Sequence, residues 1–321
     1  MEVKSSSHSN RFKRQTFHSV LLYWKLTQEL LRPIRRSLKL NRLHQRRKAI
    51  QKLAAPEHRP KSQPKVLVYI AHIVSSEEAK NQEKACAKIE RLKHTIDGLL
   101  SSFAHCDLKI IIATVPGRSI THYLPKYQIQ HIQVQEELDC DPMFVGFRIQ
   151  ENLVNQVESF DWFIFIEDDI VINDAFFIEK LENFNQSCGY EDAVLLPHRY
   201  EIDKGIKQYI DLTIDTELAW NKLSIVNISG IKFAEYTNPH AGMYCLSQTQ
   251  LRRWIKSGRS WRNQELIVGP LESAVTFCLL ECFALYKPHP DNLRFLEVRH
   301  YDTKYSQLNP ETSPYRLSGV V

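Results

Sequence analysis

Two nearly continuous apolar runs limit the fold of this 321-residue sequence more than any other feature. They are KVLVYIAHI, which starts at Lys65, and LKIIIATV, which starts at Leu108. Short runs rich in Val, Ile and Leu are typical of buried strands. Six apolar residues between the runs share one face of a predicted helix: Ile89, Leu92, Ile96, Leu99, Leu100 and Phe103. The pattern therefore predicts a strand, a crossover helix and a second strand.

The segments that follow extend the same alternation. YQIQHIQVQ alternates apolar and polar residues and predicts a strand near the sheet edge. Asp141 as N-cap and Pro142 at the first helical position predict a helix in DPMFVGFRIQENLVNQV, which leads into the apolar run WFIFI. This order predicts an α/β fold with a mixed, mainly parallel sheet flanked by helices.

The second half of the chain is less regular. Strands are predicted in AVLLPHRYE, GIKFAEYT, GMYCLS and RFLEVRHYDT, and helices in QTQLRRWIKSG and GPLESAVTFCLLECFALY. Gly258 ends the first of these helices, and Pro270 suits the first turn of the second.

Charge divides the chain into two parts. Residues 1–64 contain 16 Lys and Arg against 3 Asp and Glu, whereas the rest contains 26 against 34. The Pro-containing polar stretch APEHRPKSQPK, which starts at Ala55, predicts a linker. We therefore expect a basic helical N-terminal extension at residues 1–64 and one domain at residues 65–321.

Residues 20–53 of the extension mix apolar and basic positions with helical character. This composition fits a peripheral helix on an anionic membrane, and it fits equally well an arm that packs on a partner or is solvated. Nucleic acid is a third and less favoured partner, because the body has no matching basic stripe.

The expected location is the cytoplasm, with peripheral membrane attachment as the alternative. Seven scattered cysteines without metal-ligand spacing favour reduced thiols. No secretory signal is evident at the start, and VLLYWKLTQELL is too short to span a bilayer.

Three adjacent carboxylates, Glu167, Asp168 and Asp169, follow the apolar run in DWFIFIEDDIVINDAFF. Ligands of open α/β sheets bind beyond the carboxyl ends of the strands, where these residues are expected to lie. Adjacent carboxylates repel one another when ionised, and a cation among them removes this repulsion. Oxygen ligands select hard ions such as Mg²⁺ or Mn²⁺. Such an ion usually bridges carboxylates to substrate phosphates. The alternative is a solvated acidic turn that caps a helix, with Asp174 as its N-cap.

FIFIEDDIVINDAFFIEKLENF resembles the metal-binding segment of GT-A fold glycosyltransferases and is closest to the N-acetylglucosaminyltransferase I type. The resemblance implies that Asp169 holds a divalent cation, Mn²⁺ or Mg²⁺. The same cation would bridge the diphosphate of a nucleoside diphosphate sugar. Glu167 and Asp168 would then lie beside the nucleotide and the donor sugar.

The resemblance covers residues 65–305 in outline and implies further site residues. It places the nucleotide base near Tyr69, Ala71 and His72, and the donor sugar near His240, Ala241 and Gly242. Arg148, on the helix before the motif, is expected to reach the diphosphate, although a surface role suits it equally. Gly242 permits close approach of a ligand and serves a turn equally well.

Two late residues complete the expected site. Glu272 lies in the first turn of a predicted helix, where the helix dipole keeps a carboxylate ionised, so it is the candidate base for the acceptor hydroxyl. A simple N-terminal helix carboxylate is the alternative for Glu272. His300 is the candidate second metal ligand.

The motif and the resemblance together predict a metal-dependent, inverting glycosyltransferase. It would move a sugar from a nucleoside diphosphate sugar to a glycan or a lipid-linked hydroxyl acceptor. The tryptophan-rich acidic segment that carries the base in the resembled type has no clear equivalent, since SWRNQELIVGPLES matches it only loosely. A catalytically silent sugar-nucleotide-binding protein and a metal-dependent nucleotidyl or phosphoryl transferase remain as alternatives. The latter is disfavoured because no P-loop is present.

Overall fold

The computed structural model describes residues 38, 41–42, 63–188, 192–212, 223–235, 240–258, 266, 269–308 and 316–318. The chain divides into two compact units, Met1–Arg46 and Arg47–Val321. Leu38, Asn41 and Arg42 are helical, and the other residues of the predicted extension before residue 63 lie outside the described part. The boundary predicted at residue 64 stays a prediction.

The second unit contains the predicted mainly parallel sheet. The sheet has the order β11-β4-β1-β2-β3, in which β1 to β4 are parallel and β11 is antiparallel to β4. Its strands are β1 (Lys65–Ala71), β2 (Asp107–Thr114), β3 (Ile132–Glu136), β4 (Trp162–Glu167) and β11 (Met243–Ser247). The mixed α/β fold class is therefore confirmed.

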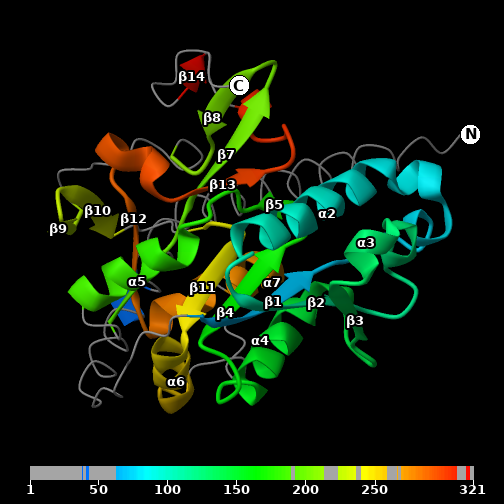
Figure 1. Cartoon of the computed structure of the whole chain (residues 1–321), viewed down its shortest axis with the longest axis horizontal. Coiled ribbons are helices and arrows are strands. Elements are labelled where there is room, and N and C mark those ends of the chain that lie inside the picture. Colours follow the sequence, from blue (N-terminus) through cyan, green and yellow to red (C-terminus); the bar gives the residue numbers. More distant parts are fainter. Residues whose placement is uncertain are drawn as a thin grey trace, which may run out of the picture. The chain divides into compact units, whose positions relative to one another are not determined.

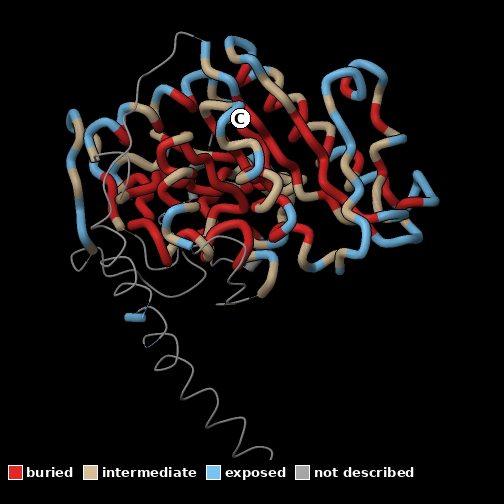
Figure 2. Tube along the Cα trace, turned by 90° about the horizontal axis from the view of Figure 1, so that it is seen from below, coloured by how far each residue is buried: buried red, intermediate tan, exposed pale blue. Residues whose placement is uncertain are grey.

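Helices cover both faces of this sheet (Figure 1). Alternate residues of β1 pack on opposite sides, because side chains of a strand point alternately to its two faces. Val66, Val68 and Ile70 share a core with α2 (Gln82–Ser102), whereas Leu67 and Tyr69 share another with α4 (Val145–Asn155). Residues of α6 (Gln248–Lys256) and α7 (Pro270–Val275) also belong to the second core. Figure 2 shows the buried residues along the strands between these layers.

Two further sheets pack beside the first. One has the order β6-β12-β10-β9 and the other β14-β8-β7-β13-β5. Their strands are β5 (Ile170–Val171), β6 (Ala193–Leu195), β7 (His198–Asp203), β8 (Ile206–Tyr209), β9 (Ile225–Ile228), β10 (Ile231–Glu235), β12 (Ala284–Pro288), β13 (Glu297–His300) and β14 (Arg316–Ser318).

The remaining helical segments are short, apart from α5. They are η1 (Glu78–Lys80), η2 (Thr121–Tyr123), α3 (Lys126–Ile129), η3 (Pro142–Phe144), α5 (Phe177–Cys188), η5 (Phe277–Glu281), η6 (Pro290–Phe295) and η7 (Ser306–Leu308). Asp141 accepts a hydrogen bond from Met143 N and starts η3 as predicted. Asp174, which the alternative interpretation treats as an N-cap, accepts a hydrogen bond from Phe176 N in the turn before α5.

Three sequence predictions need correction. AVLLPHRYE forms two strands in different sheets, β6 and β7, with Pro197 between them, because proline lacks the N–H group that a strand ladder needs. The first half of YQIQHIQVQ forms α3 rather than a strand, since Pro125 starts a helical turn there and only Ile132–Glu136 joins the sheet. The helix predicted in GPLESAVTFCLLECFALY is interrupted at Thr276, and its last residues form β12. Backbone pairing of β12 with β6 and β10 stabilises that strand, so tertiary hydrogen bonds override the local helical pattern.

The structure also bears on the cysteines and on membrane insertion. All seven cysteines are free thiols, as predicted, and Cys245 and Cys282 are buried. None of the helices in the described ranges has both the length and the apolar character needed to cross a bilayer.

Candidate active site

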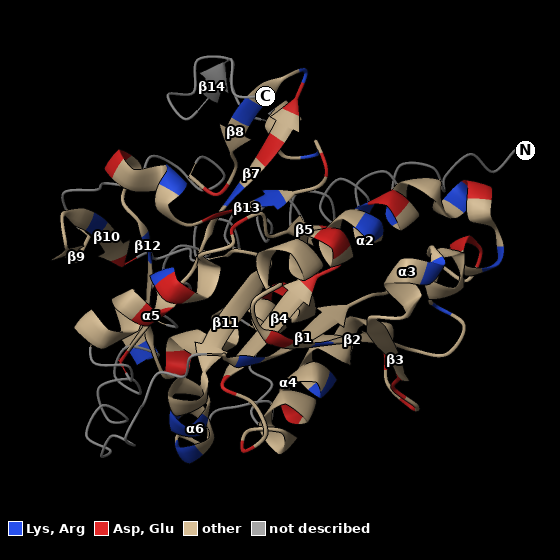
Figure 3. Cartoon of the chain, viewed as in Figure 1, with Lys and Arg blue, Asp and Glu red and all other residues tan. Residues whose placement is uncertain are grey.

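The three carboxylates lie at the carboxyl edge of the parallel sheet. Glu167 is the last residue of β4 and pairs with Ala71, the last residue of β1. Asp168 and Asp169 form the turn between β4 and β5. Figure 3 shows acidic residues where β4 ends, and acidic and basic residues next to each other on β7 and β13. The fold therefore delivers the acidic motif to the position where ligands of open α/β sheets bind.

Asp168 is held by a buried histidine. His72 is 0% exposed, and its Nδ1 lies 2.6 Å from Asp168 Oδ2. Its Nε2 accepts a hydrogen bond from Ile120 N at 3.3 Å, so Nδ1 is the nitrogen that donates to Asp168. Thr95 Oγ1 donates to the Asp168 carbonyl oxygen. His72 was expected to border a nucleotide base, but here it supports Asp168 and has no free ring face.

Asp169 and His300, the two predicted metal ligands, lie together. His300 Nε2 is 3.3 Å from Asp169 Oδ2, and Tyr301 N donates to the Asp169 carbonyl oxygen at 2.7 Å. Asp169 Oδ1 is buried and has no hydrogen-bond partner among the described residues. A buried carboxylate oxygen without a donor is costly, so this atom is suited to receive a cation.

Asp169 and His300 stabilise each other's charged forms. Burial would raise the pKa of Asp169, but the hydrogen bond and the positive charge of His300 outweigh burial and lower it. Burial would lower the pKa of His300, but hydrogen bonds to Asp169 and Glu201 raise it to about 9. Without a cation, the imidazolium therefore compensates the carboxylate.

Glu167 lies against the loop that precedes β11. Its backbone N–H donates to the Gly242 carbonyl oxygen at 3.0 Å. Gly242 has φ +62°, and a Cβ at this residue would lie 2.9 Å from Glu167 Oε2, so the position requires glycine. Burial, with the nearby charge of Asp169, raises the pKa of Glu167 to about 7. The structure thus brings Gly242 to the acidic motif.

A buried cluster of charges, which the sequence prediction missed, lies beside these residues. Arg199 Nη2 donates to Asp211 Oδ1 at 2.7 Å, and Lys287 Nζ donates to Asp211 Oδ2 at 3.1 Å. Lys287 Nζ also donates to the His240 carbonyl oxygen at 2.6 Å. The charge of Arg199 acts on both Glu167 and Asp169. The sequence does contain a signal for this cluster, because Arg199 in LLPHRYE and Lys287 in ALYKP are charged residues within apolar strand patterns. Buried charges are rare unless they are paired, so such residues indicate a buried ion pair.

His240 and Ala241 connect this cluster to Gly242. Ala241 is fully buried, and the His240 ring stacks on Phe277 with an interplanar angle of 4°. Burial, with the charge of Arg199, lowers the pKa of His240 to about 3, so its imidazole is neutral. Its Nδ1 is buried without a hydrogen-bond partner among the described residues. The predicted donor-sugar residues therefore lie in one loop next to Glu167.

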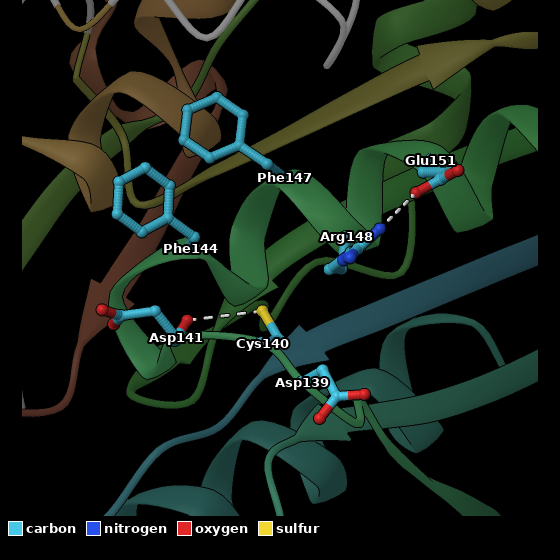
Figure 4. Close-up of a pocket in the computed structure, with 7 residues that line it drawn as sticks. All are labelled: Asp139, Cys140, Asp141, Phe144, Phe147, Arg148 and Glu151. Atoms are coloured by element: carbon cyan, nitrogen blue, oxygen red, sulfur yellow. Dashed lines mark hydrogen bonds and ion pairs between the residues drawn. The ribbon is translucent and has the colours of Figure 1, made fainter.

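Arg148 lines a pocket of about 380 Å³ at the start of α4. Figure 4 shows its lining residues: Asp139, Cys140, Asp141, Phe144, Phe147, Arg148 and Glu151. Arg148 is exposed and donates to Glu151 at 3.1 Å, so it is held within its own helix. Tyr69, expected beside the base, is buried and donates to Gln135 Oε1 at 3.2 Å. Ala71 remains partly exposed at the end of β1.

Glu272 lies in the first turn of the six-residue helix α7 and is partly exposed. The Glu272 carboxylate folds back toward the start of the helix. Its Oε2 lies so near Gly269 that a Cβ added to this glycine would be only 2.5 Å away. The helix packs on α4, where a Cβ at Gly146 would lie 2.7 Å from Ala274 Cβ. The N-terminal position predicted for Glu272 is confirmed, whereas its role as base stays a prediction.

The residues present fit one divalent cation bound through few protein ligands. Within the described ranges, no group of three or more His, Cys, Asp or Glu side chains is arranged as a metal site. Asp169 and His300 supply one carboxylate and one imidazole, a donor set that Mn²⁺ accepts. Mg²⁺ and similar ions commonly use one or two carboxylates and take other ligands from water and substrate phosphates.

No protein-family model matches the sequence, and no curated protein matches it significantly. Solved structures with some likeness include a protein from Desulfovibrio desulfuricans named as a nucleotide-diphospho-sugar transferase. It is 17% identical, with a TM-score of 0.27, over 42% of this chain and 59% of that protein. The match thus spans less than two thirds of that protein's length.

Two more solved structures show a likeness over longer segments. A protein from Thermus thermophilus named mannose-1-phosphate geranyltransferase is 8% identical, with a TM-score of 0.38, over 70% of this chain and 73% of that protein. A 4-diphosphocytidyl-2C-methyl-D-erythritol synthase is 9% identical, with a TM-score of 0.35, over 73% of this chain and 92% of that protein.

Proposed function

We propose that this protein is a GT-A type, metal-dependent glycosyltransferase that moves a sugar from a nucleoside diphosphate sugar to a hydroxyl acceptor. The observation that carries the proposal is the Asp169 carboxylate at the carboxyl edge of a parallel sheet. Its buried Oδ1 has no hydrogen-bond partner in the part of the chain that the structure describes, and its Oδ2 lies 3.3 Å from His300 Nε2. Glu167, at the end of β4, and Asp168, in the turn, directly precede Asp169. Such an arrangement suits a cation that also contacts a diphosphate.

In this proposal, Asp169 and His300 hold the cation. When bound, Mn²⁺ or Mg²⁺ would offset the negative charge that develops on the leaving diphosphate. His72 keeps the Asp168 carboxylate in place beside the nucleotide. The loop of His240, Ala241 and Gly242 supports Glu167 next to the donor sugar.

Glu272 is the proposed base. A carboxylate can act as a general base and accept the proton of an acceptor hydroxyl. One direct displacement with Glu272 as base inverts the configuration of the transferred sugar. The partial exposure of Glu272 leaves it accessible to an acceptor.

A thermal-shift panel of nucleoside diphosphate sugars, with and without Mn²⁺, tests the donor and the cation together. A ligand that binds only the folded protein raises its melting temperature. We expect at least one donor to do so only with Mn²⁺, and the shift to disappear in Asp169→Asn. If no donor shifts the protein in any condition, the proposal is wrong.

Glu272→Gln separates catalysis from binding. We expect this variant to keep the Mn²⁺-dependent shift and to lose turnover by roughly 100-fold or more, the usual contribution of a general base. Unchanged turnover would exclude Glu272 as the base. A wild-type protein that binds donors but transfers nothing to any acceptor would support the catalytically silent alternative.

The nucleotidyl or phosphoryl transferase alternative predicts different products. Glycosyl transfer releases a nucleoside diphosphate, whereas nucleotidyl transfer from a nucleoside triphosphate releases inorganic diphosphate. Product analysis with both kinds of donor therefore decides between them.

The basic segment at residues 20–53 is proposed to attach the enzyme to an anionic membrane that carries a lipid-linked acceptor. Its charge supports this role, since Lys and Arg near a surface bind anionic lipids. Deletion of residues 1–60 is expected to abolish sedimentation with phosphatidylserine liposomes. Unchanged sedimentation would contradict membrane attachment through this segment.

A further inference from the structure

Glu201 lies on β7, the strand that pairs with the His300 strand β13. It is the third polar residue near the cation site, after Asp169 and His300. In the parallel pairing of β13 with β7, Val298 lies opposite Arg199, and Arg299 lies opposite Tyr200. The next residues in this register are His300 and Glu201. On its other side, β13 pairs with β5, where His300 lies opposite Ile170, the residue after Asp169. Strand pairing thus brings Glu201, His300 and Asp169 together from three separate parts of the sequence.

The Glu201 carboxylate is fully buried and accepts three hydrogen bonds. They come from His300 Nδ1 at 2.7 Å, Tyr305 N at 3.2 Å and Ser306 N at 2.6 Å. A carboxylate anion only accepts, so the His300 Nδ1 carries a hydrogen that points at Glu201. The other ring nitrogen, Nε2, is consequently the one that faces Asp169 Oδ2.

We infer that Glu201 is a positioning residue that fixes the His300 imidazole with Nε2 directed at the cation site. The inference rests on the proposed function. Histidines that bind metals usually donate their second N–H to a carboxylate or carbonyl, and this contact sets the ring orientation. Loss of that contact typically lowers metal affinity about 10-fold to 100-fold.

The turn after β13 is anchored by contacts of its own. Arg91 pairs with Asp302 at 2.8 Å, and the His94 ring stacks on Tyr301 with centroids 4.2 Å apart. These contacts join the turn to α2 without Glu201. They provide a structural reason for Glu201→Gln to keep the fold while it changes the partner of His300.

Glu297 provides a matched control. It lies three residues before His300 on the same strand and pairs with Lys207 Nζ at 2.5 Å and with Tyr209 Oη at 2.5 Å. Glu297→Gln therefore removes a partly buried carboxylate from β13 without touching His300. An effect of Glu201→Gln that this control lacks comes from the contacts of Glu201 itself, and the double-mutant cycle with His300 separates the His300 contact from those to Tyr305 N and Ser306 N.

The experiment measures Mn²⁺ affinity by electron paramagnetic resonance, with Mn²⁺ alone and with Mn²⁺ plus inorganic diphosphate. We expect Glu201→Gln to weaken binding about 10-fold or more. Glu297→Gln is expected to bind as the wild type does. In a double-mutant cycle, Glu201→Gln should add little to the loss caused by His300→Ala, because both changes remove one function. If Glu201→Gln does not fold, Glu201→Asp replaces it, because aspartate keeps the charge but has a shorter side chain. We expect Glu201→Asp to bind Mn²⁺ more weakly than the wild type, by less than about 10-fold.

The outcomes separate this inference from the proposed function. Wild-type affinity in Glu201→Gln, or a loss that adds fully to that of His300→Ala, overturns the role of Glu201 alone, provided that Asp169→Asn loses binding. If Asp169→Asn binds Mn²⁺ as the wild type does, or if the wild type binds none, both the cation site and the role of Glu201 are wrong.

Discussion

At the scale of single residues, the candidate site depends on contacts that leave little room for substitution. His72 and His300 each place one ring nitrogen against a carboxylate of the acidic motif, at Asp168 and Asp169. Gly242 has a backbone conformation that other residues rarely adopt, and it lies directly against Glu167. Each of these residues has a separate physical reason to be the residue it is.

Gly242→Ala is expected to destabilise the protein for two reasons. A left-handed backbone conformation costs a non-glycine residue about 1–2 kcal/mol. The new methyl group would also lie 2.9 Å from Glu167 Oε2 and from the Ile170 side chain, and overpacking typically costs about 1–3 kcal/mol more. Urea unfolding measures the sum of the two effects.

Gly230→Ala is the control for Gly242→Ala. Gly230 has φ +85°, but a Cβ there would meet no atom within 4 Å. This variant should lose only the backbone contribution. Equal losses of unfolding free energy in the two variants would show that the contact with Glu167 does not constrain Gly242.

At the scale of elements, close packing of α2 on β5 positions the turn that carries the carboxylates. Gly98 on α2 lies so near to β5 and the residue after it that an added Cβ would be 2.7 Å from Ile172 O and 2.8 Å from Val171 Cγ1. Ser102 on the same helix donates to Ile172 O at 2.9 Å. The helix is therefore fixed to the strand that follows Asp169.

Gly98→Ala tests this packing. Alanine stabilises a helix interior by about 0.5–1 kcal/mol relative to glycine. We expect a net loss of unfolding free energy nonetheless, because the methyl group meets backbone that cannot move aside cheaply and overpacking costs about 1–3 kcal/mol. Chemical unfolding measures the balance.

The exposed Ser101 on the same helix is the control for Gly98→Ala. Ser101→Ala should leave the unfolding free energy unchanged or raise it slightly, since alanine is the better helix former. A Gly98→Ala variant as stable as the wild type would mean that α2 moves away from β5 without cost.

At the scale of the whole molecule, buried charges and neutral histidines connect the sheets. His198 on β7 donates from Nε2 to the Pro288 carbonyl oxygen of β12 at 2.6 Å. Burial, with the charge of Lys287, lowers the pKa of His198 from 6.5 to about 3. This histidine is consequently neutral in the folded protein at pH values where the unfolded chain is already protonated.

The stability of the protein is therefore expected to fall in mild acid. A group with a lowered folded-state pKa contributes its full stabilisation above its unfolded pKa and loses it as the pH falls toward the folded value. For His198 the window is pH 6.5 to about 3. Within this window, the contribution of His198 to the unfolding free energy should fall by about 1.4 kcal/mol for each unit by which the pH is lowered.

His198→Gln isolates this contribution, since a glutamine amide also donates a hydrogen bond but does not titrate. The difference in unfolding free energy between wild type and variant should be constant above pH 7 and should shrink or reverse between pH 6.5 and 4.5. Other titrating groups cancel in this difference. Parallel pH curves for the two proteins would contradict the prediction.

The sequence alone was enough to predict the mainly parallel sheet, the N-cap at Asp141, and the delivery of Glu167, Asp168 and Asp169 to the sheet edge. Local patterns carry this information, because apolar runs, capping residues and Pro positions act within a few residues of themselves. The sequence also pointed to Asp169 and His300 as a pair, through a family resemblance and not through spacing.

Only the tertiary structure decided which side chains support the motif. His72, Glu201 and Lys287 come from parts of the chain far apart in the sequence, and the pairing of the strands brings them to the carboxylates or to the loop beside them. It also decided that the residues from Ala284 onward form a strand, since the partners of β12 lie on β6 and β10. The local sequence specified which residues end a strand; long-range backbone hydrogen bonds and burial determined which charges meet there.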